Sequence, residues 1–238
     1  MRNYLIIDGT DSRSFGVYIS GQATFGSPAR SYNMLTVPGR DGDLVGPERR
    51  LKNIEVTYPA FVFDNFETNI ANFRNFLLSR DGYVKITDTY HSGEYRMGVY
   101  AGPFTPSVDK SLKAGEFNIV FNCKPQRFLD SGDTATTAVT ITNPTKWDSR
   151  PLITVPAQGA VYSGTIEIGT QTITIEDAPA STVMTIDCEM MDCYGGSGEN
   201  LNGYVSFSGY DFPVLHPGAN GISSDISSVS IKGRWFIV

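Results

Sequence analysis

A cysteine and a histidine are the residues of this sequence that could together perform nucleophilic catalysis. Cys123 and His91 could form a thiolate–imidazole pair, in which the imidazole takes the proton of the thiol. Cys123, however, ends the segment 116–123, where apolar and polar residues alternate as in a half-buried strand. A structural thiol buried in such a strand is unreactive. The chain has only two histidines, which leaves few candidates for a general base, and it contains no Gly-x-Ser-x-Gly elbow. The sequence therefore does not predict a hydrolase that acts through a nucleophilic side chain.

Two carboxylates near residue 190 could serve a glycosidase. Asp187 and Glu189 are two residues apart, which on a strand places both side chains on one face. A pair of carboxylates flanking a sugar is the machinery of glycoside hydrolysis. The same spacing is also found on the solvent-exposed face of a β-sandwich, and the neighbouring residues do not indicate desolvation. We therefore expect a protein that is not an enzyme.

Metal and cofactor sites are not expected either. Asp41 and Asp43 resemble the start of a calcium loop, but the acidic or amide residue required before the next glycine is missing. Cys188 and Cys193 could hold zinc only with two further ligands, and both histidines lie far away in the sequence. The chain contains no glycine-rich phosphate-binding motif. We expect reduced, buried thiols and no bound cofactor.

Composition and charge narrow the classes of partner. The 238 residues carry a net charge of −6, with a pI of about 4.9, which argues against a dedicated nucleic-acid-binding protein. No apolar stretch approaches the roughly 18 residues of a membrane span, so we expect no membrane insertion. The first residues read as the first strand of the fold and not as a signal peptide.

Aromatic residues in the second half of the chain leave one binding function open. Exposed aromatic side chains on a β-sandwich are typical of carbohydrate-binding modules. The candidates are Trp147, Tyr162, Tyr194, Tyr204, Tyr210 and Trp235. Burial of Trp235 in the C-terminal strand, and packing of Trp147 over a loop end, are the alternative interpretations.

The pattern of turns and apolar residues predicts a mainly β protein with two domains. Residues 34–63 are expected to form a long hairpin with an exposed tip at 39–50, because its Pro-Gly and Asp-Gly pairs are strong turn signals. One amphipathic helix is expected from Phe66 to about residue 80, capped by Asp64, with an apolar stripe that includes Phe73 and Leu77. The small polar residues 131–138 suggest a linker between residues 1–130 and 139–238. After it, short strands indicate a sandwich or barrel.

Several motifs in order along the chain resemble the distal tail proteins of siphophages. They include Val-Pro-Gly-Arg-Asp-Gly-Asp-Leu at 37–44 and the predicted helix with the Asp-Gly-Tyr that follows it. The remaining motifs lie at 8–16, 123–126, 143–153, 186–189, 211–220 and 232–235. Each motif is short, and the resemblance rests on their order and spacing over nearly the whole chain.

The resemblance implies a fold, a role and a set of partners. The fold would be a tail-tube-like N-terminal β-sandwich with one helix, followed by a galectin-like C-terminal β-sandwich. The role would be a hexameric ring that joins the tail tube to the tail-tip baseplate of a phage or prophage virion, after assembly in the host cytoplasm. The partners would be other copies of the chain, the tail-tube protein, the tail-tip hub protein and receptor-binding proteins, with DNA passing through the ring without specific binding.

The long hairpin is the expected subunit interface. At about 3.4 Å per residue, a ten-residue strand reaches about 34 Å, too far for its tip to pack on its own domain. Pairing with a neighbouring subunit would protect the exposed strand edge. The interface residues would be Arg40, Asp41, Asp43, Arg49 and Arg50. The alternative is an ordinary hairpin folded against its own domain.

Overall fold

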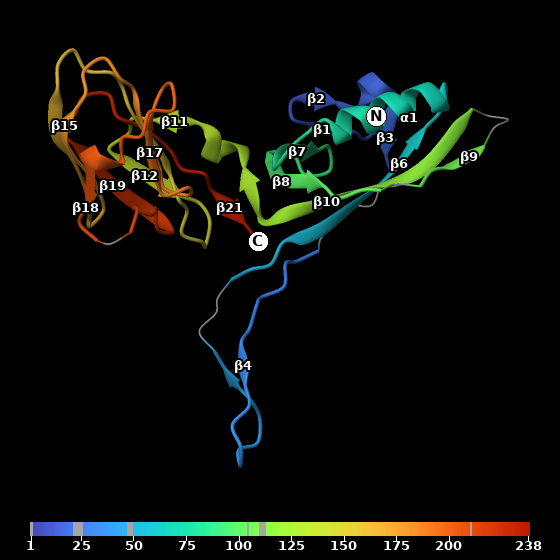
Figure 1. The fold of residues 1–238 in the computed structure, drawn as a ribbon, viewed down its shortest axis with the longest axis horizontal. Coiled ribbons are helices and arrows are strands. Elements are labelled where there is room, and N and C mark those ends of the chain that lie inside the picture. The colour runs from blue at the N-terminus through green and yellow to red at the C-terminus, as the bar shows by residue number, and fades with distance from the viewer. Residues whose placement is uncertain (1, 21–25, 47–49, 104, 110–112, 210) are drawn as a thin grey trace. The chain divides into compact units, whose positions relative to one another are not determined.

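The computed structural model describes residues 2–20, 26–46, 50–103, 105–109, 113–209 and 211–238. The chain divides into two compact units, Met1–Arg127 with Val238, and Phe128–Ile237 (Figure 1). The described residues are mainly β, with a single α-helix, which confirms the predicted fold class. None of the helices described is long and apolar enough to cross a membrane.

The first unit is built around a strongly curved antiparallel sheet. Its strand order is β2 (Thr10–Asp11), β1 (Leu5–Ile7), β7 (Val84–Asp88), β8 (Glu94–Tyr100), β10 (Ala114–Leu129), β6 (Ile54–Val62) and β3 (Val17–Ile19), and β9 (Ser107–Asp109) also pairs with β10. The backbone N–H of Ile19 donates to the carbonyl oxygen of Asn3, just before β1. This bond brings β3 back beside the start of the sheet, so the sheet nearly closes on itself.

Buried and exposed residues alternate along the two longest strands, β6 and β10, and the buried side chains fill the inside of this sheet. Val56, Tyr58, Ala60 and Val62 of β6 are buried, and their polar or exposed neighbours face outward. Across β10, the inward residues are again every second one, from Phe117 to Cys123. This period of two is the pattern that predicted half-buried strands at both places.

The helix α1 (Phe66–Leu78) covers one side of this core. Phe66, Phe73 and Leu77 are buried, as the predicted stripe requires, and the ring of Phe73 lies 5.6 Å from that of Phe15. The predicted cap is wrong: Asn65 occupies the N-cap position at a φ of 45° and its side chain makes no capping hydrogen bond. The carbonyl oxygen of Asp64 instead accepts a hydrogen bond from the side chain of Asn69.

The segment between β3 and β6 forms a narrow hairpin, which we call the arm (residues 29–46 and 50–52; Figure 1). Its regular part is short, because only β4 (Met34–Leu35) and β5 (Leu44–Val45) pair as strands. The backbone N–H of Ser31 bonds the carbonyl of Arg50, which continues the ladder toward the base. The predicted hairpin of 34–63 is therefore wrong in its extent, since 54–62 belongs to the buried sheet as β6.

The second unit is a sandwich of two five-stranded antiparallel sheets. One has the order β11 (Ala135–Thr136), β20 (Ser230–Lys232), β13 (Leu152–Val155), β16 (Met184–Asp187) and β17 (Asp192–Gly195). The other has the order β12 (Thr140–Asn143), β19 (Gly218–Ser224), β14 (Tyr162–Ile168), β15 (Gln171–Ala178) and β18 (Val205–Phe207). The short strand β21 (Phe236–Ile237) ends the unit.

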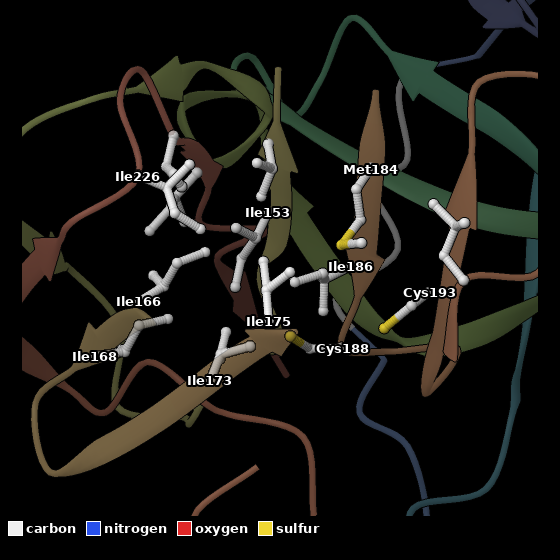
Figure 2. Packing of buried hydrophobic residues seen from close by; sticks show 14 of the residues in the cluster. Ile153, Ile166, Ile168, Ile173, Ile175, Met184, Ile186, Cys188, Cys193 and Ile226 are labelled. Atoms are coloured by element: carbon white, nitrogen blue, oxygen red, sulfur yellow. The ribbon is translucent and has the colours of Figure 1, made fainter. Parts of the chain in front are cut away.

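Isoleucine dominates the space between the two sheets. Ile153 and Ile186 come from one sheet, and Ile166, Ile173 and Ile175 come from the other; all five are fully buried. Figure 2 shows these side chains pointing into a common core. Each buried isoleucine contributes about 1.5–3 kcal/mol by the removal of its surface from water.

The segment 131–138, expected to be a linker, is largely structured. Residues Asp130–Asp133 form a 3₁₀ turn, and Ala135 and Thr136 pair with Lys232 and Ile231 as the edge strand β11. The division between the compact units lies a few residues earlier, between 127 and 128. A run of small polar residues can pair at a sheet edge as well as form a linker, and composition alone does not separate the two.

Candidate assembly surface

The arm exposes large apolar side chains on both of its faces. Every residue from 32 to 45 is exposed. Met34 pairs with Val45, and Leu35 pairs with Leu44. Because successive residues of a strand point to opposite faces, the first pair lies on one face of the ribbon and the second on the other. Between 38 and 61% of each of these four residues is exposed.

The tip of the arm carries charges of both signs. Arg40, Asp41, Asp43 and Arg50 are exposed, and Asp43 accepts a hydrogen bond from the hydroxyl of Thr36 at 2.9 Å. Arg49, the fifth residue of the predicted interface, lies outside the described residues. The turn itself depends on glycine, since Gly39 and Gly42 adopt φ values of 79° and 77°.

These tip charges make no ion pair with one another among the residues that the structure describes. Apolar side chains exposed on two faces are a feature of surfaces that are covered on assembly. The structure thus brings Arg40, Asp41 and Asp43 together at one tip, and places Arg50 nearer the base, opposite Ser31.

The carboxylate pair proposed for glycoside hydrolysis does not form an active site. Asp187 is 3% exposed, and its two oxygens accept hydrogen bonds from both terminal nitrogens of Arg234, at 2.7 and 2.9 Å. Glu189 lies beyond the end of β16, in the following turn, so the two carboxylates do not share a strand face. The prediction of a solvent-exposed face at Asp187 is also wrong.

Hydrogen bonds and burial together set the ionisation of Asp187. Burial raises the pKa of Asp187, but hydrogen bonds from Arg234 and from the backbone N–H groups of Met190 and Glu189 outweigh it and lower the pKa below its usual value. The ionised side chain of Asp187 therefore holds the following turn and the guanidinium of Arg234 in place. This arrangement is structural, since every oxygen of the carboxylate is occupied.

The cysteine–histidine pair does not show the features of a nucleophilic site. Cys123 is buried in β10, and burial raises the pKa of its thiol to about 11. The Nδ1 atom of His91 lies 2.9 Å from a carboxylate oxygen of Asp88. A thiol whose pKa is raised by burial is protonated at neutral pH and does not act as a nucleophile.

We expect all three thiols to be unreactive in the folded protein. Burial also raises the pKa values of Cys188 and Cys193 to about 12. At pH 8, an Ellman assay should detect less than about a tenth of the thiols within minutes in native protein, and all of them in 6 M guanidinium. Rapid reaction of one thiol in the native protein would show that its burial is wrong.

The aromatic candidates for carbohydrate binding that the structure describes do not form an exposed platform. Trp235 is 6% exposed and belongs to the sandwich core, and Trp147 stacks on Phe236 at 6.3 Å between ring centroids. Tyr162 packs against the same core, and Tyr210 lies outside the described residues. Tyr204 remains exposed, at 38%. No group of three or more potential metal-binding side chains occurs within the described ranges.

Comparisons with known proteins agree on the fold. No family model and no curated protein matches the sequence. Among solved structures, the chain is similar to the Dit protein of phage SPP1, described as a paradigm of the hub of the adsorption apparatus in phages that infect Gram-positive bacteria. The TM-score is 0.70 at 17% identity, over 97% of both chains.

Two structures of the phage p2 baseplate in its activated conformation, with Ca and with Sr, are also similar. Their TM-scores are 0.56 and 0.55, each at 12% identity, over 97% and 96% of this chain and of theirs. The likeness covers both compact units and not the sandwich alone. Over nearly its whole length, this chain therefore has the fold of proteins found in phage hub and baseplate structures.

Proposed function

We propose that the protein is a structural distal tail protein of a siphophage or prophage, which forms a hexameric ring between the tail tube and the tail-tip baseplate. The observation that carries this proposal is the likeness to the SPP1 hub protein over 97% of both chains, with a TM-score of 0.70. The order of the motifs in the sequence and the exposed arm support it. In this proposal the second unit is a galectin-like sandwich in shape.

The proposed partners follow from this location. They are further copies of the chain, the tail-tube protein, the tail-tip hub protein and receptor-binding proteins, in a virion assembled in the host cytoplasm. The net charge of −6 suits a ring through which DNA passes without adhering, because an acidic wall repels phosphates. A non-enzymatic role agrees with the ion-paired carboxylate of Asp187 and the buried thiol of Cys123.

The arm is the proposed clasp between neighbouring subunits. A ring closes when one patch of each subunit binds a different patch of the next, after a fixed rotation. The arm offers such a patch, since it is exposed on both faces and ends in Arg40, Asp41 and Asp43. Seating it on a neighbour would remove its apolar side chains from water.

Negative-stain imaging of the pure protein tests this proposal. The expected particles are rings with sixfold symmetry and a central opening. Addition of the purified tail-tube protein should produce short tubes capped by such rings. Particles without rotational symmetry, with or without the tail-tube protein, would contradict the proposal.

We also propose that the two halves fold independently. Each compact unit has its own hydrophobic core, and the division lies between 127 and 128. Separately expressed residues 1–127 and 128–238 should each unfold in a single cooperative transition, which circular dichroism during heating can measure. Loss of cooperative unfolding in both fragments would show that the halves depend on each other.

A further inference from the structure

An open groove lies between the helix α1 and the segment that follows β8. It is lined by Arg74 and Leu78 of α1 and by residues 100–103, and its volume is about 450 Å³. The backbone N–H of Ala101 donates to the carbonyl oxygen of Val120 at 2.9 Å, which holds the segment beside β10. The arm contributes none of the described residues that line this groove.

Most of the surface of the groove is apolar. On the helix side, Leu78 is 65% exposed, whereas Leu77 beside it is buried in the core. On the other side, the ring of Tyr100 is half-buried against Phe121, and Pro103 is exposed. A leucine exposed beside an aromatic ring and a proline is stabilised when another apolar side chain covers it.

Arg74 is the charged residue among those that line the groove. Its side chain is exposed and makes no hydrogen bond or ion pair with the residues that the structure describes. It lies close enough to Tyr100 to affect its ionisation: burial raises the pKa of Tyr100, and the charge of Arg74 lowers it by less. The groove therefore offers an apolar surface and one uncompensated positive charge, which fits a partner with an apolar side chain and a carboxylate.

The spacing of these two features is set by the helix. Arg74 and Leu78 are four residues apart on α1, so they lie on the same face of the helix, one turn apart. At 1.5 Å of rise per residue, the positive charge and the exposed leucine are separated by about 6 Å along the axis. A matching partner must present its carboxylate and its apolar group at a similar separation.

One face of the arm presents these two groups, and we call it the acidic face (Met34, Thr36, Asp43 and Val45). Met34 pairs with Val45, and the hydroxyl of Thr36 donates to one oxygen of Asp43, so all four side chains lie on the same side of the ribbon. Met34 and Val45 are 54 and 61% exposed. Asp43 and Val45 are two residues apart, which on a strand is about 7 Å.

We propose that the groove receives the acidic face of the arm of a neighbouring subunit, which is a second copy of this chain. In this contact the carboxylate of Asp43 pairs with the guanidinium of Arg74, and Met34 and Val45 cover Leu78. The inference rests on the proposed ring, and it names the patch to which the clasp binds. The arm and the groove are different patches, as a contact that closes a ring requires.

Reversal of the two charges tests the pairing. Arg74→Glu and Asp43→Arg should each raise the dissociation constant of the ring roughly tenfold or more, because each substitution places two like charges together. The double variant should assemble to within about threefold of the wild type, because every interface again joins opposite charges. Sedimentation velocity over a range of concentrations measures both effects. A double variant that assembles no better than the single variants, or single variants that assemble as the wild type does, would overturn the proposal.

Two control variants make the same charge changes elsewhere. Lys146→Glu and Glu176→Arg alter exposed positions of the second unit and should leave the dissociation constant unchanged. Arg74 and Asp43 are exposed as well, so circular dichroism should show the wild-type fold in all the variants. An equal loss of assembly in the controls would trace the effect to net charge and would overturn the pairing.

Photo-cross-linking identifies the occupant of the groove directly. Protein with Leu78→p-benzoylphenylalanine is mixed with isotope-labelled wild-type protein and irradiated, and mass spectrometry then maps the cross-linked peptides. Labelled peptides that contain Met34 or Val45 should be attached at position 78, because the arm comes from another copy. Cross-links to unlabelled arm peptides alone, or only to other segments, would overturn the proposal.

The outcomes also separate this inference from the proposed function. Rings that form without labelled cross-links to the arm would leave the ring standing and overturn the contact. Labelled cross-links to the arm without sixfold rings would leave the contact standing and overturn the proposed ring. The absence of both would overturn both.

Discussion

Replacement of residues 33–45 by a short Gly-Ser turn should dissociate the proposed ring into single subunits while the unfolding temperature stays within about 2 °C of the wild-type value. All thirteen residues removed are exposed, so the core of the first unit loses no buried side chain. The assembled ring, by contrast, would lose the proposed clasp. Sedimentation velocity measures the assembly, and circular dichroism during heating measures the stability.

Paired variants of the arm show which face carries the contact. Met34→Ser with Val45→Ser makes one face of the ribbon polar, and Leu35→Ser with Leu44→Ser does the same to the other, as the register of β4 and β5 requires. Shortening of the glycine-rich turn 196–198 in the second unit serves as a control of similar exposure. If the shortened arm still allows the same ring to form, the arm is not the clasp.

Asp187→Ala should destabilise the second unit by about 3–5 kcal/mol, the usual cost of removing one partner of a buried ion pair. The substitution leaves Arg234 without its two hydrogen bonds and frees the backbone N–H groups of Glu189 and Met190. Urea unfolding of residues 128–238 or of the full chain measures the loss. Glu176→Ala, at an exposed position of β15, should change the stability by less than about 0.5 kcal/mol.

The same variant has a characteristic pH dependence. Because the pKa of Asp187 is lowered in the folded state, the ionised side chain stabilises the fold above the unfolded pKa of about 3.9, and this contribution is lost as the pH falls through the lower folded pKa. The difference in stability between wild type and Asp187→Ala should therefore be constant from pH 7 to about 5 and shrink below about pH 4. A difference that grows in acid would contradict the ionised state of Asp187.

Patterns among neighbouring residues predicted the helix, the buried face of one strand and the turn of the arm. The stripe containing Phe73 and Leu77 marked the helix, and the alternation in 116–123 marked the buried face of β10. The Pro-Gly and Asp-Gly pairs marked the turn of the arm. In each case the physical signal lies within one element, so neighbouring residues suffice to detect it.

Features that depend on distant partners could not be predicted in this way. Asp187 is buried because Arg234, 47 residues away, reaches both of its oxygens. The burial of Arg96 likewise follows from where β8 packs, and an arginine in an alternating strand gives no sign of it. The sequence shows that the two strands of the arm carry the apolar pairs Met34-Leu35 and Leu44-Val45. Only the register in the structure shows which of these residues pair with each other.

The mass of the purified protein in solution tests the central claim most directly. A hexameric ring has six times the 26.0 kDa mass of the chain. Light scattering coupled to gel filtration, over a hundredfold range of concentration and with the tail-tube protein added, should give this mass in at least one condition. A mass of 26.0 kDa in every condition, including with the tail-tube protein, would contradict the account.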